Sequence, residues 1–176
     1  MEEEQKGWYA VKVFYNRVGR YKNDIISLGQ EVYMPMRIDR KVVDGEVIRS
    51  LKPLIPSTFF VYCTPSWLVK YRYEHWGYVM YYSDTGRFDP GRIDDHEMEM
   101  FRMVTSKGDD SQVEYIGKDR PEYHRGDKVR ILDGMYKGAE GYIKRIRKDR
   151  KLLVSVKGVA VVAIAGIHTS KLEKVV

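Results

Sequence analysis

Apolar side chains recur along this chain at two spacings, one typical of strands and one typical of helices. Residues 8–15 (WYAVKVFY) are rich in aromatic and β-branched side chains, which favours a strand. Between residues 18 and 28 the apolar side chains recur at helical spacing, so we expect a helix there. Asp44-Gly45, within residues 37–50, is a typical hairpin turn. The other elements expected in this part are strands at 32–36, 54–63 and 77–82, and helices at 66–73 and after Asp94-Asp95.

The order of these elements predicts a fold. Strand, helix, strand, hairpin, strand, helix, strand and helix follow one another, as in a split βαβ, ferredoxin-like domain of the α+β class. We expect antiparallel strands that are covered by helices on one side. In the third helix Met98, Phe101 and Val104 form one apolar face, which predicts that these three side chains are buried.

The hydrophobic period is lost after the third helix. Residues 106–122 combine glycines, charges and a single proline, which predicts a linker with a brief extended piece at 113–116. The domain organisation expected from this break is a first domain at 1–107, a linker at 108–121 and a second domain at 122–176.

The second domain has the pattern of a small β-barrel. Val129 and Ile131 alternate with charged residues, as in a half-buried strand. Gly134, Gly138 and Gly141 indicate tight bends and a close approach to a neighbouring strand. The strands expected here are 128–132, 141–146, 152–156, 159–164 and 168–172, which would form a five-stranded, SH3-like barrel.

Charge is unevenly divided between the two expected domains. Residues 122–176 contain 13 Lys and Arg against 6 Asp and Glu, a net charge of +7, whereas residues 1–121 contain 18 against 19. Such an asymmetry is compatible either with an anionic partner such as nucleic acid or with an ordinary solvated surface. No apolar run approaches the roughly 20 residues that span a bilayer. The start, MEEEQKG, is unlike a signal or transit peptide. We therefore expect a cytoplasmic protein without membrane association.

The residues that carry enzymatic chemistry are not arranged in any recognisable motif. The four histidines are scattered without metal-ligand spacing, and the glycines lack the Lys-Ser/Thr of a phosphate loop. Cys63, the only cysteine, lies in an apolar run, which predicts a buried thiol without a disulfide. We expect no catalytic residue, no metal and no cofactor.

The glycine-punctuated strand pair of the second domain resembles the KOW motif of NusG-type transcription factors and several ribosomal proteins. The first domain resembles the NusG N-terminal (NGN) domain, so that the likeness covers nearly the whole chain. Its order matches too: Trp8-Tyr9 opens the first strand, and Pro53-Leu54-Ile55-Pro56 leads into the aromatic strand Phe59-Phe60-Val61. The residues that carry the KOW likeness are Gly126, Val129, Ile131, Gly134, Gly138, Gly141 and Ile143.

The resemblance implies a surface for the coiled-coil clamp helices of RNA polymerase. The matching positions are Lys12, Ile55, Thr58 and Phe60, where the family usually has an aromatic at Ile55 and tyrosine at Thr58. Strand alternation places Phe60 and Tyr62 on one face and Phe59 and Val61 on the other, so one pair is expected in the core and the Phe60 face is the candidate for docking. Rings at Tyr33, Phe59 or Tyr78 are alternatives for the missing aromatic. The start of the second helix, with Val69, Lys70 and Tyr71, matches the segment that touches the polymerase lobe and its gate loop.

Further partners are implied at three other places. Arg17, Arg20 and Lys22 are candidates for contacts with non-template DNA, with a solvated helix face as the alternative. Met135, Tyr136 and Lys137 lie in the loop that NusG proteins present to termination factor Rho or to ribosomal protein NusE, and Tyr136 is the aromatic expected at the loop tip. The basic residues that are candidates for nascent RNA, or for a solvated hairpin end, are Lys144, Arg145, Arg147, Lys148, Arg150 and Lys151.

The function implied is a monomeric elongation or antitermination factor that associates with the nucleoid through RNA polymerase. The departures at Ile55 and Thr58 favour a specialised relative over the general factor. A ribosomal-type KOW protein that binds structured RNA without polymerase is the alternative. Its weakness is the near-neutral, aromatic-rich first domain, because ribosomal proteins tend to be basic throughout.

Overall fold

The computed structural model describes residues 2–83, 88–106 and 112–176. The chain divides into two compact units, each assembled from two segments. The first unit combines Met1–Pro35 with Ile55–Met98, and the second combines Met36–Leu54 with Glu99–Val176. No helix among the described residues is both long and apolar enough to cross a membrane.

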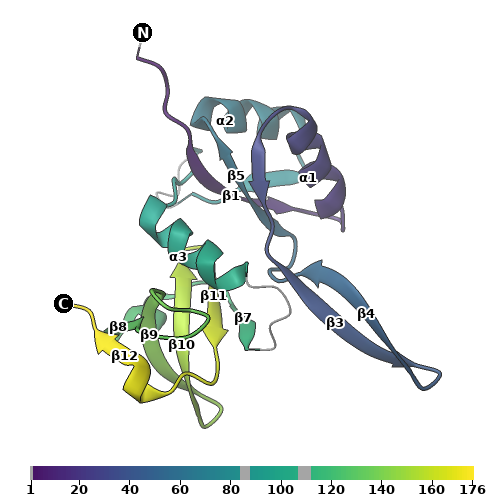
Figure 1. Cartoon of the computed structure of the whole chain (residues 1–176). Helices are drawn as coiled ribbons and strands as arrows, with labels where there is room; N and C mark the ends of the chain where they lie inside the picture. Colours follow the sequence, from purple (N-terminus) through teal and green to yellow (C-terminus); the bar gives the residue numbers. More distant parts are fainter. Residues whose placement is uncertain (1, 84–87, 107–111) are drawn as a thin grey trace. The chain divides into compact units, whose positions relative to one another are not determined.

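The first unit contains a four-stranded sheet in the order β2-β5-β1-β6, of which the two central strands, β1 and β5, are labelled in Figure 1. Strand β5 pairs antiparallel with both β1 and β2, so β1 and β2 run parallel with β5 between them. Strand β1 likewise separates β5 from β6. Both βαβ connections are therefore split, which confirms the predicted ferredoxin-like arrangement. The strands are β1 (Gly7–Val13), β2 (Glu31–Tyr33), β5 (Thr58–Cys63) and β6 (Val79–Tyr81).

Helices α1 (Val18–Ser27) and α2 (Pro65–Glu74) cover one face of this sheet. Tyr21 and Ile25 on α1 and Leu68 and Tyr71 on α2 join one apolar cluster with alternate residues of β1 and β5. Helix α2 begins as its sequence predicts, because the Thr64 hydroxyl accepts a hydrogen bond from the backbone N–H of Trp67 at 3.3 Å and proline follows the cap. Cys63 is buried in the same cluster, and burial raises the pKa of its thiol to about 12.

Helix α3 (Asp95–Thr105) begins where the acidic pair predicts. The Asp94 carboxylate accepts a hydrogen bond from the backbone N–H of Glu97 at 3.1 Å, which satisfies one of the free donors of the first turn. Met98, Phe101 and Val104 are all buried, as the spacing of the three residues predicts.

The predicted hairpin forms a separate two-stranded sheet of β3 (Met36–Val43) and β4 (Glu46–Pro53). Its turn consists of Asp44 and Gly45 at φ values of +51° and +81°. Both central residues of a type I′ turn have positive φ, so Asp-Gly suits this connection. The strands are longer than the sequence analysis expected, and β3 begins at the residue where the preceding strand was expected to end.

The second sheet has six strands rather than five, in the order β12-β8-β9-β10-β11-β7. The additional strand is β7 (Val113–Gly117), which pairs with β11. It coincides with the brief extended piece expected at 113–116, so this part of the predicted linker belongs to the sheet. Residues 107–111 of that segment lie outside the described residues. The other strands are β8 (Lys128–Ile131), β9 (Glu140–Ile146), β10 (Asp149–Val156), β11 (Ala160–Ile164) and β12 (Leu172–Lys174), with 3₁₀ turns at Pro121–His124 and Thr169–Lys171.

The close approach predicted for the glycines occurs at Gly141 on β9. A Cβ added there would clash with the carbonyl oxygen of Leu153 and lie 2.9 Å from its carbonyl carbon. Only glycine allows strands β9 and β10 to come so close. Every residue of β11 is buried, in keeping with its run of valine, isoleucine and alanine.

Candidate functional site

Three of the four residues matched to clamp binding meet on one face of the first sheet. Lys12 on β1 lies directly opposite Thr58 on β5, and the next pair on that face is Ala10 opposite Phe60. Residues that face each other across an antiparallel pair share a side of the sheet. Phe59 belongs to the apolar cluster under α1 and α2, so the predicted alternation of β5 is confirmed.

The exposure of that face differs from the sequence-based expectation. Lys12 is exposed, but Ile55 and Thr58 are buried and Phe60 is fully buried. The expectation that only one side of β5 is covered was wrong. The Tyr33 ring lies 6.5 Å from the Phe60 ring, and the Thr58 hydroxyl donates a hydrogen bond to the Pro56 carbonyl at 3.1 Å.

Helix α2 presents Val69 and Lys70 to solvent but turns Tyr71 inward. Tyr71 follows the buried Leu68 by three positions, which is the helical spacing of one face. Its ring stacks on Trp67 at 5.0 Å, and its hydroxyl donates a hydrogen bond to the Asp24 carboxylate at 2.6 Å. Burial raises the pKa of Tyr71, and the bond to Asp24 raises it further. Its grouping with Val69 and Lys70 as a surface residue is therefore corrected, because the same ring is part of the core.

Sequence reasoning missed two large exposed rings near the end of α2. Tyr73 and Trp76 are both largely exposed, one in the last turn of the helix and the other just after it. The signal was present in the sequence, since Tyr73 lies two residues after the buried Tyr71 and so belongs to the opposite side of the helix.

Cations and aromatic rings alternate at the connection between β1 and α1. The Arg17 guanidinium lies over the Tyr78 ring at 4.7 Å, and the Lys12 ammonium lies 5.5 Å from the Phe14 ring. Tyr15, which the sequence analysis did not single out, is 76% exposed and has a left-handed backbone with φ of +61°. Its ring meets Tyr78 edge to face at 5.9 Å. Exposed rings beside cations are the components of a stacking surface for single-stranded nucleic acid.

The other two basic candidates on α1 differ in exposure. Arg20 is exposed, and its guanidinium lies 5.7 Å from the Tyr21 ring. Lys22 is half-buried. Arg17 and Arg20 therefore each lie near an aromatic ring, Tyr78 for Arg17 and Tyr21 for Arg20.

The loop between β8 and β9 holds its three candidate residues in different surroundings. Met135 and Lys137 are exposed, whereas Tyr136 is only 3% exposed. The expectation of a freely presented ring at Tyr136 is thus corrected. The methyl group of Met103, from the second half of α3, lies beside Gly138 in the same loop. The buried Tyr136 hydroxyl has no hydrogen-bond partner among the residues that the structure describes.

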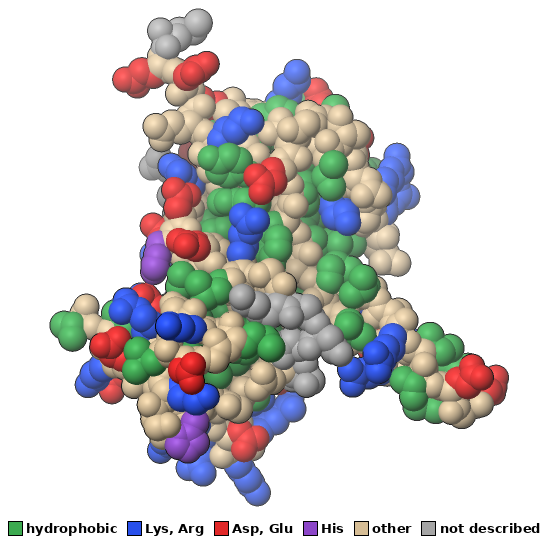
Figure 2. Space-filling model, in the orientation of Figure 1, with side chains coloured by type: hydrophobic (Ala, Val, Ile, Leu, Met, Phe, Trp, Pro, Cys, Tyr) green, Lys and Arg blue, Asp and Glu red, His purple; other side chains and the backbone are tan. Residues whose placement is uncertain are grey.

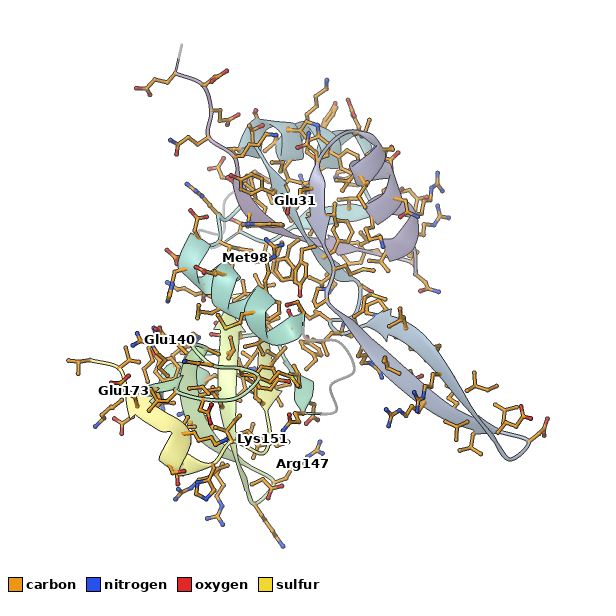
Figure 3. The ribbon with its side chains drawn as sticks, viewed as in Figure 1. Glu31, Met98, Glu140, Arg147, Lys151 and Glu173 are labelled. Carbon is orange, nitrogen blue, oxygen red and sulfur yellow. The ribbon has the colours of Figure 1, made fainter. Side chains whose placement is uncertain are left out.

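The six basic candidate residues of the second unit lie on the β9–β10 hairpin. Arg145 lies opposite Arg150 and Lys144 opposite Lys151, with Arg147 at the turn (Figure 3). The Lys151 ammonium is 3.1 Å from the Glu114 carboxylate. Lys144 and Lys151 are half-buried, so the exposed positive charge is contributed by Arg145, Arg147, Lys148 and Arg150.

Across residues 2–83, 88–106 and 112–176, no group of three or more His, Cys, Asp or Glu side chains is placed to hold a metal ion.

Comparison with known proteins adds two findings. The family model described as NusG, "Transcription termination factor nusG", matches residues 6–102, which is more than half of the chain. The solved structure titled "Domain interaction in Thermotoga maritima NusG" is 22% identical and superposes with a TM-score of 0.52, covering 98% of each chain. At that identity the superposition supports the fold alone. A comparison with curated proteins gave no match.

Proposed function

The chain belongs to the NusG family of transcription factors, and we propose that it is an elongation and antitermination factor that docks on the clamp helices of RNA polymerase. The docking domain is residues 1–107, which contains the matched segment. By holding the clamp closed, the protein shifts polymerase toward its elongating state and reduces pausing or termination. It acts in the cytoplasm, at the nucleoid, and as a monomer.

The observation that carries this proposal is the shared face of Lys12, Thr58 and Phe60 on strands β1 and β5. The resemblance selects these residues from positions far apart in sequence, and the strand register brings them together. Ile55, which is buried just before β5, is the fourth residue that the resemblance selects. Val69 and Lys70, which are exposed on α2, are the candidates for the polymerase lobe and gate loop.

Docking through the Phe60 face requires that the residues covering Phe60 and Ile55 move away. Phe60 and Ile55 cannot contact a partner helix while they are buried, although Lys12 can. An apolar patch that opens only on binding can still contribute, because its burial against the partner replaces its burial in the free protein. The free energy of uncovering lowers the apparent affinity by the fraction of molecules that are open.

The barrel recruits a second partner through Met135, Tyr136 and Lys137, for which Rho and ribosomal protein NusE are the candidates. Tyr136 must also be uncovered for this role. Its buried hydroxyl lacks a hydrogen-bond partner among the described residues, and such a group costs about 1–3 kcal/mol. This cost favours an arrangement in which the loop is exposed and the hydroxyl is solvated or bound.

Nucleic acid contacts accompany both roles. The Arg17 and Arg20 region, with Tyr15, has the cations and the exposed ring that a single non-template strand needs. The exposed arginines of the β9–β10 hairpin are the candidates for nascent RNA, since phosphate contacts supply most non-specific affinity.

Retention on core RNA polymerase tests the clamp proposal. We expect Lys12→Glu and Val69→Asp to weaken retention, because both side chains are exposed and their replacement leaves the core intact. Phe60→Asp and Ile55→Asp should abolish it, but circular dichroism must show that these buried variants fold. Lys6→Glu, an exposed reversal just before β1, is the matched control. If the surface variants bind polymerase as the parent does, clamp docking through this face is wrong. Retention on ribosomal RNA alone would instead favour the ribosomal-type alternative.

A terminator reporter placed behind different leader sequences separates a general factor from a specialised one. The departures at Ile55 and Thr58 support a specialised antiterminator that acts on few leaders. In that case readthrough rises for particular leaders only.

A further inference from the structure

The β3–β4 hairpin divides its side chains between two unlike faces. Residues opposite each other on an antiparallel pair share a face, and every second residue along a strand returns to it. On one face every side chain is either apolar or an arginine, and we call it the arginine face. Its four cross-strand pairs are Met36 with Pro53, Ile38 with Leu51, Arg40 with Arg49, and Val42 with Val47.

The carboxylates of the hairpin lie away from the arginine face. Asp39 and Glu46 belong to the opposite face, and Asp44 is in the turn. On the opposite face the Asp39 carboxylate binds the Lys52 ammonium at 2.6 Å and the Arg37 guanidinium at 3.3 Å. The two faces therefore differ in charge, since the residues of the two strands contribute only positive charge to the arginine face.

The arginine face is accessible along most of its length. Arg40 and Arg49 are exposed, and the flanking apolar residues Val42 and Leu51 are 73% and 68% exposed. Figure 2 shows hydrophobic and basic side chains along the hairpin and acidic ones near its tip. Apolar side chains this exposed, beside two guanidinium groups, are typical of an interaction surface rather than of a solvated strand.

We propose that the arginine face docks in the major groove of duplex DNA. That groove admits a two-stranded β-ribbon, whereas the major groove of double-stranded RNA is too narrow for side chains to enter. Strands of this length span about 26 Å, which is several base pairs. The polyanion attracts Arg40 and Arg49 together, although two like charges directly opposite each other are otherwise unfavourable.

Two apolar cross-strand pairs flank the arginine pair on the arginine face. Ile38 with Leu51 lies on one side of the arginine pair and Val42 with Val47 lies on the other. Aliphatic side chains contact thymine methyl groups in the major groove, while arginine binds phosphate oxygens or guanine. None of these residues belongs to the surface proposed for polymerase, so the two proposals can fail separately.

Duplex binding by the full chain, measured by fluorescence anisotropy between about 50 and 200 mM salt, tests the proposal. The double variant Arg40→Ala, Arg49→Ala should bind a short DNA duplex about tenfold more weakly at low salt. It should also reduce the slope of log K against log salt by about 1.8, which corresponds to two lost phosphate contacts. The control Arg37→Ala, Lys41→Ala removes the same charge from the opposite face and should change the slope by less than half as much.

Two Asp substitutions at apolar positions distinguish docking by the arginine face from a general effect of charge. Leu51→Asp on the arginine face should weaken duplex binding strongly, whereas Ile48→Asp adds the same charge to the opposite face and should weaken it little. Equal effects within either matched pair would overturn the proposal, as would equal affinity for an RNA duplex. The proposal is also overturned if the arginine-face variants lose retention on polymerase while their DNA binding is unchanged, because the face would then bind protein. Failure of clamp docking appears instead in the Lys12→Glu retention experiment.

Discussion

Two hairpins of this protein have the same kind of turn but are built from different residues. In the β3–β4 hairpin Asp44 and Gly45 have φ values of +51° and +81°, and in the β9–β10 hairpin Arg147 and Lys148 have +52° and +82°. Asp-Gly is suited to this geometry, because glycine has no steric penalty there and aspartate tolerates it. Arg-Lys is not, and each such residue costs about 1–2 kcal/mol.

The surroundings of the two hairpins explain the difference. Strand β10 pairs with β9 on one side and β11 on the other, and Leu152 and Val154 are buried within the six-stranded sheet. That sheet holds the strained turn in place. Among the described residues, strands β3 and β4 pair only with each other, and an isolated two-stranded hairpin is at best marginally stable. A turn needs favourable local chemistry where tertiary support is weak, and can depart from it where packing fixes the strands.

The largest effect on this comparison is expected from Gly141→Ala. A Cβ at this position meets the backbone of Leu153, which cannot move without disturbing the pairing of β9 and β10. We expect a loss of about 3 kcal/mol in the free energy of unfolding of the barrel, measured by chemical denaturation. Gly19→Ala, in α1 where an added Cβ has open space, is the control and should stabilise by about 0.5–1 kcal/mol. An unchanged barrel in Gly141→Ala would show that the strands can separate freely.

Replacing Arg147-Lys148 by Asn-Gly should remove the strain of the second turn. The expected gain is about 1–2 kcal/mol in the free energy of unfolding, because both residues then suit positive φ but the new glycine loses more conformational entropy on folding. The matched change Asp44→Asn in the first hairpin should alter stability by less than about 0.5 kcal/mol. A gain in stability together with weaker RNA binding would show that the charges of Arg147 and Lys148 serve binding at the expense of turn geometry. If stability does not rise, the Arg147-Lys148 turn is not strained and the comparison of the two turns is wrong.

The smallest effect concerns the pH dependence of the first hairpin. A hydrogen bond from Lys52, aided by Arg37, holds the pKa of the Asp39 carboxyl below its ordinary value. A carboxyl with a lowered pKa in the folded state stabilises it above the unfolded pKa, and this contribution is lost as pH falls through the folded pKa. The protection factors for backbone amide exchange in β3 and β4, which correct for the intrinsic pH dependence of exchange, should therefore fall in acid, only slightly because the group is exposed. Asp39→Asn should remove the dependence, and its persistence in that variant would point to another group.

Local sequence patterns identified most helices and strands but not which of their faces are buried. The caps of α2 and α3, the Asp44-Gly45 turn and the buried face of α3 all follow from residues close in sequence. Strand β7 was expected only as a brief extended piece of the linker, because its partner, β11, lies far later in the chain and five residues of mixed polarity carry little signal alone. Alternation also grouped Phe60 apart from Phe59 correctly, yet it could not say that both sides of β5 are buried.

The candidate site likewise combines features that the sequence identified with features that only the structure showed. The resemblance selected Lys12, Thr58 and Phe60, and strand pairing puts them on one face. Tyr71 was assigned to a surface by the family resemblance, and Tyr136 because an aromatic ring at a loop tip is poorly explained by core packing. Helical spacing from Leu68 could have identified Tyr71 as core, whereas nothing near Tyr136 in sequence indicates what covers it.

The sequence by itself determined the order of elements, the positions of turns and caps, and the family to which the chain belongs. These depend on backbone preferences and side-chain periods within a few residues. Only the tertiary structure decided which faces are buried, how the hairpin separates arginines from carboxylates, and where a strained turn is tolerated. Burial and register depend on strands and helices distant in the chain, and no local pattern specifies which partner will lie against a given face.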